Sequence, residues 1–323
     1  MTTPGVSLVS SGVNPNNSEN FSSGVILFVY IITFLIGIPA NILAFYTFCC
    51  KVCHKPAPID ILLLNLTLSD ILFLAFLPFK MKEAMDNQLW NLPLPLCPIT
   101  EFMFFTTIYT SILFLTGISV ERYLSVGHPT VYRKPGRTIY AMVTSVAFWI
   151  LSVSHCSVVF VMHYSNTSNT ANTSQARTKC YEDFSHKQLS VLLPVRLEMF
   201  LVLFCFPFII CCFCYISLIH ILSMRPKISR RRRLHAIGLA LGTLLVFTLC
   251  FGPYNVSHIY GFWWKISPPW RVKATLLSTF NACLDPIIFF LSSSDVRSKL
   301  MHCLESFRAG LHRHDLDNKP EGS

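Results

Sequence analysis

Seven long apolar runs constrain the fold of this chain more than any other feature. They cover roughly residues 24–50, 58–84, 96–127, 139–163, 189–223, 234–262 and 270–292. A helix needs about 20 apolar residues to cross the hydrocarbon core of a bilayer. Helix is also the economical conformation there, because lipid cannot satisfy the hydrogen bonds of an open backbone. The sequence therefore predicts an all-α membrane protein with a seven-transmembrane helix bundle.

Charge is scarce and unevenly placed. Charged residues make up 13% of the chain, against about 25% in soluble domains. Residues 1–23 contain no Lys or Arg, whereas the connections 51–57, 128–138 and 224–233 are basic, as is the C-terminal tail. The positive-inside rule then predicts an extracellular N-terminus and a cytoplasmic C-terminus. The net charge of +10 is read as an orientation signal, and nucleic-acid binding is not expected because no soluble basic domain is present.

The chain divides into four predicted segments. They are an extracellular N-terminus (1–23), a seven-transmembrane domain (24–293), an amphipathic eighth helix (294–308) and a cytoplasmic tail (309–323). Leu300, Cys303, Leu304 and Phe307 recur with helical spacing, which favours a short helix along the inner leaflet. Cys303 is a palmitoylation candidate, with a free thiol as the alternative.

The segments predicted to lie outside carry two kinds of covalent signal. Sequons begin at Asn16, Asn20, Asn166 and Asn172, which predicts a glycoprotein. Cys97 lies at the outer mouth of the third run and Cys180 in the second outer loop. Both face an oxidising compartment, so a disulfide between them is favoured over two free thiols.

Ionisable residues at one end of the bundle suggest a ligand site. Arg196 lies near the start of the fifth run, Arg271 opens the seventh and His258 closes the sixth. Such groups are costly in a membrane and usually mark a binding site. The planar fork of Arg suits a carboxylate, and Tyr254 shares a helix face with His258. The alternatives are arginines that snorkel to lipid headgroups and an interfacial histidine with satisfied hydrogen bonds.

An ordered set of polar residues and prolines runs through the seven spans. Its members are Asn41, Asp70, Glu121-Arg122-Tyr123, Trp149, Pro207, Tyr215, Pro253, Asn281 and Asp285-Pro286. Over about residues 24–308 this set resembles the rhodopsin-like family of G-protein-coupled receptors. The resemblance implies that Arg122 faces the G-protein cavity, with activation roles for Glu121, Tyr123, Tyr215, Phe251, Pro253, Asp285 and Pro286. It also implies an allosteric sodium pocket of Asp70, Ser111, Asn281 and Asp285.

Three departures from the family pattern concern activation. Phe251 replaces the usual tryptophan, Phe289 replaces a tyrosine, and Arg233 stands where many relatives have an acid. A lock between Arg122 and the sixth span is therefore not expected, and Glu121 alone is left to pair with Arg122. We expect the inactive state to be held less strongly and the protein to show constitutive activity.

The outer half resembles the short-chain free fatty acid receptors. The similar segments are ILLLNLTLSD at 61–70, VLLPVRLEM at 191–199, CFGPYNVSH at 250–258 and the Trp270-Arg271 pair. FFTTIY at 104–109 is similar to the member that favours propionate and butyrate, and CYEDF at 180–184 to the acetate-preferring member. The resemblance implies that Arg196, Arg271 and His258 bind the carboxylate, with Tyr254 completing the shell. It places His155, Phe105, Glu182 and Asn255 in the pocket.

Glu182 has two interpretations, as a partner of an arginine in the ligand-free state or as a solvated acid.

The resemblance implies acetate, propionate and butyrate as ligands and Gi/o as the transducer. Gq and arrestin are further implied partners, beside membrane lipids. Acids this small predict micromolar to millimolar affinity. No cofactor is expected beyond sodium, and no enzyme signature is present.

The sequence is compatible with other functions. A receptor for medium- or long-chain fatty acids or another carboxylate is the main alternative, and an organic-acid transporter is a weaker one. A transporter usually shows two related halves, and no repeat relates the spans here. A light sensor needs a lysine deep in the seventh run, where only Lys273 near its outer end is found.

Overall fold

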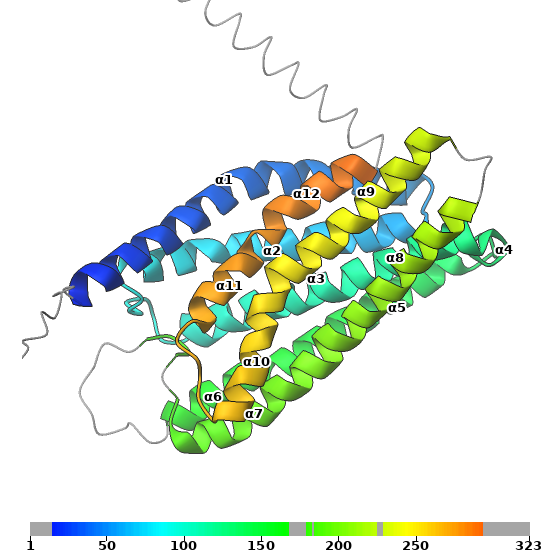
Figure 1. Ribbon diagram of the computed structural model, residues 1–323. Helices are drawn as coiled ribbons and strands as arrows, with labels where there is room; N and C mark the ends of the chain where they lie inside the picture. The colour runs from blue at the N-terminus through cyan, green and yellow to red at the C-terminus, as the bar shows by residue number, and fades with distance from the viewer. Residues whose placement is uncertain (1–14, 168–178, 183, 225–228, 293–323) are drawn as a thin grey trace, which may run out of the picture.

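The computed structural model describes residues 15–167, 179–182, 184–224 and 229–292, and within these ranges every regular element is a helix (Figure 1). The elements are α1 (Pro15–His54), α2 (Pro58–Met85), α3 (Leu96–Gly127), α4 (Pro129–Tyr132), α5 (Arg137–Cys156), α6 (Val158–Thr167), α7 (His186–Met199), η1 (Phe200–Cys205), α8 (Phe206–Met224), α9 (Arg230–Val246), η2 (Phe247–Phe251), α10 (Gly252–Trp264), α11 (Arg271–Thr279) and α12 (Asn281–Ser292). The predicted all-α membrane fold is confirmed.

Six continuous helices in the described ranges are long and apolar enough to cross a membrane. The fifth is His186–Met224 and joins α7, η1 and α8, while the sixth is Arg233–Trp264 and includes η2. The seventh predicted run is divided at Phe280 into α11 and α12, and neither piece alone has the length of a span. The division therefore accounts for the difference between six continuous helices and seven predicted runs.

Prolines explain the two wide turns in the fifth and sixth spans. The π-helical segments η1 and η2 end just before Pro207 and Pro253, respectively. Proline has no N–H and its ring clashes with the preceding turn, and a π turn is a common local response. These wide turns set the direction of α8 and α10, and α10 carries four of the predicted site residues, Pro253, Tyr254, Asn255 and His258.

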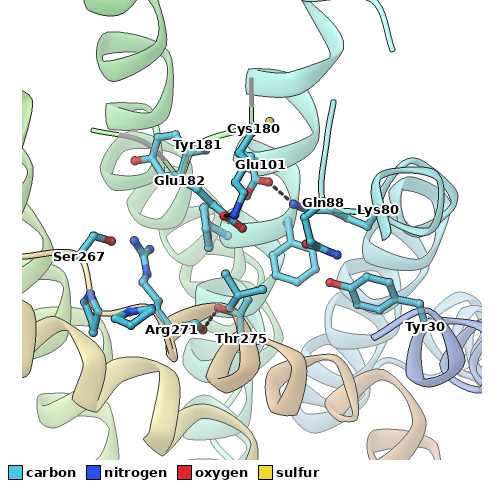
Figure 2. Close-up of a pocket in the computed structure, with 16 residues that line it drawn as sticks. Tyr30, Lys80, Gln88, Glu101, Cys180, Tyr181, Glu182, Ser267, Arg271 and Thr275 are labelled. Carbon is cyan, nitrogen blue, oxygen red and sulfur yellow. Dashed lines mark hydrogen bonds and ion pairs between the residues drawn. The ribbon is translucent and has the colours of Figure 1, made fainter. Parts of the chain in front are cut away.

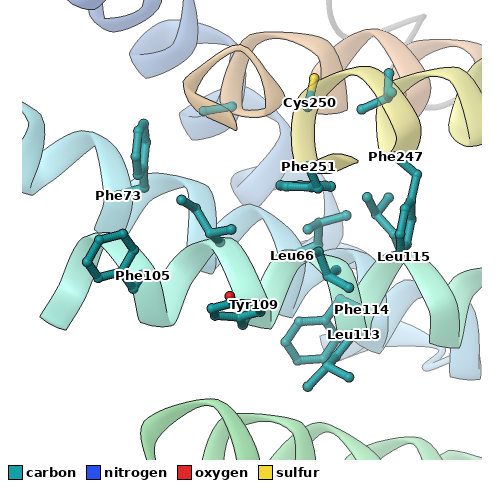
Figure 3. Close-up of a cluster of buried hydrophobic side chains, with 14 of the residues drawn as sticks. Leu66, Phe73, Phe105, Tyr109, Leu113, Phe114, Leu115, Phe247, Cys250 and Phe251 are labelled. Carbon is teal, nitrogen blue, oxygen red and sulfur yellow. The ribbon is translucent and has the colours of Figure 1, made fainter. Parts of the chain in front are cut away.

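The third span is the centre of the bundle. In its most apolar window 83% of residues are buried, against 28% in α1. Figure 3 shows the core along α3, with Phe105 and Tyr109 toward one end and Phe114 and Leu115 toward the other, near Phe251. Aromatic and aliphatic side chains from several helices share this core, so α3 is held on several sides.

The two ends of the bundle differ. Cys97 at the start of α3 forms the predicted disulfide with Cys180, and we call this the disulfide end. The opposite end carries Glu121, Arg122 and Tyr123 at the end of α3.

Several predictions concern residues that the structure does not describe. Asn172, Cys303, the helix at 294–308 and the tail at 309–323 are outside the described residues. Helix α1 begins at Pro15, inside the segment expected to precede the first span. Asn16 and Asn20 therefore belong to α1 and Asn166 to α6. Their glycosylation stays a prediction.

Candidate functional site

A cavity of about 320 Å³ opens at the disulfide end. It lies among α1, α2, α3 and α11, beneath the segment that follows Lys179 (Figure 2). Its polar lining residues include Tyr30, Lys80, Gln88, Glu101, Tyr181, Glu182, Ser267, Arg271 and Thr275. Phe104, Phe105 and Val272 add apolar surface. The size is at the lower end of the range for small-molecule pockets.

Arg271 is the first residue of α11 and points into this cavity (Figure 2). It is 8% exposed, and its Nη2 donates a hydrogen bond to the Tyr254 hydroxyl over 3.0 Å. Its guanidinium lies 5.6 Å from the ring centroid of Phe105 and 5.2 Å from that of Tyr254. No carboxylate in the described part of the chain pairs with it. A buried charge without a counter-charge is costly, so an anion here relieves a cost already present.

Arg196 on α7 is a second buried cation near the same site. It is 3% exposed, and its Nη1 donates to Ser267 Oγ over 3.4 Å. Ser267 lines the cavity together with Arg271. The Nε and Nη2 atoms of Arg196 have no hydrogen-bond partner among the described residues. Arg196 therefore has donors to offer a ligand that enters beside Ser267.

Tyr109 and Tyr254 join His258 to the core. The Tyr109 hydroxyl lies 2.9 Å from His258 Nε2, and the Tyr254 and His258 rings meet edge-on with centroids 4.8 Å apart. This contact agrees with the helix face predicted from their spacing. Tyr254 also stacks on Phe105 at 5.7 Å, while His258 Nδ1 has no partner in the described chain. Asn255 Oδ1 lies 3.5 Å from the Tyr109 hydroxyl, behind the cavity wall.

Of the four predicted pocket residues, Phe105 and Glu182 line the cavity, whereas His155 and Asn255 do not. His155 does not line the cavity. Its Nε2 lies 2.9 Å from Glu198 Oε1, and its Nδ1 donates to the Leu151 carbonyl. Glu182 does line the cavity, but it pairs with Lys179 at 3.5 Å and not with an arginine. Burial raises the pKa of the Glu182 carboxyl above its ordinary value.

An ion-pair cluster that sequence reasoning missed lies at the other end of the cavity. Lys80 Nζ lies 2.9 Å from Glu83 Oε2 and also pairs with Glu101. Both carboxylate residues are 4% exposed. The spacing of Lys80 and Glu83 on one helix was a readable signal. The partner on α3 was not readable, because only the packing of α2 against α3 brings Glu101 close.

The predicted sodium pocket lies deeper in the bundle. Asn281 Nδ2 lies 2.9 Å from Asp285 Oδ2 and 3.5 Å from Asp70 Oδ1. Asp70 Oδ2, Asp285 Oδ1 and Asn281 Oδ1 are buried without a partner in the described structure. Ser111 contacts Ser69, a residue of α2 next to Asp70. Oxygen ligands of this kind suit a small hard cation, so the residues fit the expected ion.

The opposite end shows a different pairing from the expected one. Glu121 pairs with Arg137 at the start of α5. Arg122 Nη1 donates to the hydroxyls of Tyr215 and Thr243, over 3.2 and 3.4 Å. Sequence reasoning considered only Arg122 as the partner of Glu121 and overlooked Arg137, which becomes a neighbour when α5 packs on α3.

The remaining predicted activation residues lie on α3, η2, α10 and α12. Tyr123 contacts His128, with its hydroxyl 3.2 Å from Nε2. Phe251 is fully buried against Phe247, Pro253 is in the first turn of α10, and Pro286 is inside α12.

Comparison with known proteins gives a consistent set of relatives. Residues 40–289 match the family described as 7 transmembrane receptor (rhodopsin family). The chain is similar to Free fatty acid receptor 3 from Homo sapiens, with 48% identity over 82% of this chain and 76% of that protein. It is 46% identical to Free fatty acid receptor 2 from Mus musculus, over 87% and 85% of the two chains. Free fatty acid receptor 1 from Macaca fascicularis is 31% identical, over 80% and 88%.

Proposed function

The chain belongs to the rhodopsin family of seven-transmembrane receptors and, within it, to the free fatty acid receptors, and we propose that it responds to short-chain fatty acid carboxylates. It is a receptor and not an enzyme. Acetate, propionate and butyrate bind at the disulfide end, which faces the extracellular side. Their carboxylate lies beside Arg271 and Arg196.

The observation that carries this assignment is the pair of buried arginines. Arg196 and Arg271 are both less than a tenth exposed, and neither has a carboxylate partner in the described ranges. Ser267 touches Arg196 and lines the cavity with Arg271. A carboxylate can accept two parallel hydrogen bonds from a guanidinium. A bound acid therefore supplies the negative charge that the protein itself does not place there.

The Tyr254, His258 and Tyr109 group transmits the binding event toward α3. Tyr254 accepts a hydrogen bond from Arg271, and the chain of contacts continues through His258 to Tyr109. An anion that binds Arg271 while this hydrogen bond is kept pulls on Tyr254 and changes the position of α10 relative to α3. Because α9 and α10 are continuous through η2, such a shift reaches the opposite end, where Gi/o is proposed to bind.

One observation favours a second candidate ligand class. The cavity of about 320 Å³ exceeds the space that an acid of four to six heavy atoms occupies. Phe104, Phe105 and Val272 supply an apolar wall for a longer tail, and each buried CH₂ adds about 0.8 kcal/mol. A receptor for medium-chain acids is therefore the alternative within the same family.

A sodium ion between Asp70 and Asp285 is proposed as an allosteric ligand. Asn281 and Ser111 complete the oxygen-rich surroundings. When bound, the ion balances the charge of two buried carboxylates that otherwise repel each other in a low-dielectric interior.

The test is a dose series of straight-chain acids from two to ten carbons on cells that express the receptor. Inhibition of cyclic AMP formation is measured with and without pertussis toxin, and the corresponding primary amides serve as uncharged controls. We expect responses to C2–C5 acids at micromolar to millimolar concentration, no response to the amides, and loss of the signal with toxin. A potency that rises steadily beyond C6 favours the medium-chain alternative, and responses to the amides contradict the carboxylate assignment.

A further inference from the structure

The end of the cavity remote from Arg271 carries the opposite charge. There the Lys80 ammonium pairs with the carboxylates of both Glu83 and Glu101. The Lys80 side chain is 12% exposed and the two acids are 4% exposed. One ammonium against two carboxylates leaves an excess of negative charge. Lys80 and Glu101 both line the cavity, whereas Glu83 does not, so a ligand meets the Lys80–Glu101 pair directly and the charge of Glu83 acts on it from behind the lining.

Tyr30 supplies an independent sign that a ligand group belongs at this end. It is 7% exposed, and no hydrogen bond of its hydroxyl is found among the residues that the structure describes. Tyr30 lines the cavity, and its hydroxyl points into it toward Lys80 and Gln88 (Figure 2). A phenol oxygen that faces the cavity can accept a hydrogen bond from a ligand donor, so a polar group fits here better than an alkyl tail.

Two phenylalanines connect this polar end with the arginine end. The Arg271 guanidinium lies 5.6 Å from the Phe105 ring, the Phe105 and Phe104 rings are 5.8 Å apart, and Lys80 Nζ is 5.8 Å from the Phe104 ring. The cavity thus has a cationic pole, an apolar wall and an anionic pole. A ligand complementary to all three has a carboxylate, an alkyl chain and a terminal cation.

We propose that the cavity binds ω-amino carboxylates, with the carboxylate at Arg271 and the ammonium at Glu101 and Tyr30. The carboxylate half of this assignment rests on the proposed function above. An ammonium has three donors and no acceptor, which matches the acid oxygens and the Tyr30 oxygen. A second carboxylate at this end meets the excess negative charge of Glu83 and Glu101, so dicarboxylates bind worse than amino carboxylates of the same length.

The experiment compares matched ligands on the full-length receptor. Straight-chain acids, ω-amino acids and α,ω-dicarboxylates of four to eight carbons are tested by cyclic AMP inhibition in cells with matched surface expression. In the wild type we expect at least one ω-amino acid to match or exceed the potency of the acid of equal length. Glu101→Gln is expected to weaken that amino acid about ten- to a hundredfold and to change the potency of the simple acid by less than about threefold.

Asp86→Asn is the control for lost negative charge, because Asp86 pairs with Lys82 at the end of α2 and does not line the cavity. It leaves the ratio of amino acid to simple acid potency unchanged. Tyr30→Phe is a second variant that removes only the hydroxyl, and it lowers amino acid potency selectively. If Glu101→Gln does not reach the cell surface, the response of Tyr30→Phe tests the ammonium site.

Each other outcome overturns the assignment. If simple acids act and no ω-amino acid does, the ammonium site is wrong while the proposed function stands. An unchanged ratio in both Glu101→Gln and Tyr30→Phe, or dicarboxylates stronger than amino acids, has the same meaning. If neither simple nor amino acids act, both the proposed function and the ammonium site are wrong.

Discussion

Within the described residues, Arg271 contacts two aromatic rings and the Tyr254 hydroxyl and has no carboxylate partner. Its position in the first turn of α11 adds the positive end of a helix dipole to its own charge. The exposed amides of such a turn also favour an anion. These features strengthen anion binding and leave the empty receptor with an uncompensated charge. Loss of the single hydrogen bond to Tyr254 should therefore affect affinity.

Tyr254→Phe removes the hydroxyl that Arg271 contacts over 3.0 Å and leaves the ring in place. A hydrogen bond to a charged group contributes about 1.5–3 kcal/mol, and part of that is recovered from the ligand. We expect the concentration of propionate for half-maximal response to rise about tenfold, measured at matched surface expression. Tyr260→Phe is the control, because Tyr260 is 41% exposed. Equal potency in Tyr254→Phe and wild type would show that this contact does not position Arg271.

Asp70→Asn tests the sodium assignment. Asp70 and Asp285 are buried near the same amide, so removal of one charge removes much of the attraction for a cation. In wild-type membranes, replacing sodium by N-methylglucamine is expected to increase propionate potency several-fold. In Asp70→Asn the two salts give the same potency. Sodium sensitivity that persists in the variant contradicts this site.

At the scale of residues, the most readable signal in the sequence is an ionisable side chain inside an apolar run. Arg196, Arg271 and His258 were predicted because ionisable groups are rare in apolar runs, and the structure buries all three near one another. Lys80 and Glu101 were missed because they form one site only across two helices. The contact of His155 with Glu198 was not readable either, because it forms only where two helices pack together.

At the scale of elements, the spans were predicted by length and hydropathy, and their interruptions were less accessible. Pro207 and Pro253 signalled breaks, but a proline predicts only a local disturbance, and the sequence does not show that it takes the form of the π-helical turns η1 and η2. The division between α11 and α12 at Phe280 has no proline at that point. The hydrophobic periodicity of the seventh run continues across this point, so the sequence does not show the division.

We expect the pairing of α5 with α3 to influence the basal activity of the receptor. Glu121 pairs with Arg137 of α5, while Arg122 donates to Tyr215 of α8 and Thr243 of α9. Arg137→Gln releases Glu121, and an acid next to Arg122 in the chain is then available to hold it. We expect basal inhibition of cyclic AMP to fall by about half or more. Arg133→Gln, at an exposed position, is the control. Increased basal signalling in Arg137→Gln contradicts this account.

At the scale of the whole molecule, the disulfide end works as one unit. The bond between Cys97 and Cys180 anchors Tyr181 and Glu182 over the cavity. A disulfide that closes a long loop typically stabilises a fold by about 2–4 kcal/mol. The double variant Cys97→Ser, Cys180→Ser is expected to lower the thermal midpoint of the purified receptor and to weaken propionate. Cys53→Ser, an exposed free cysteine, is the control, and unchanged potency in the double variant would show that the loop does not shape the cavity.

The central claim is that a carboxylate binds to the two buried arginines of this end. The most direct measurement is the propionate dose–response of Arg196→Ala and Arg271→Ala, normalised to surface expression. Lys273→Ala, an exposed position on α11, is the matched control. Each arginine variant is expected to lose at least a hundredfold in potency while Lys273→Ala stays at the wild-type value. Wild-type potency in either Arg196→Ala or Arg271→Ala would contradict the account.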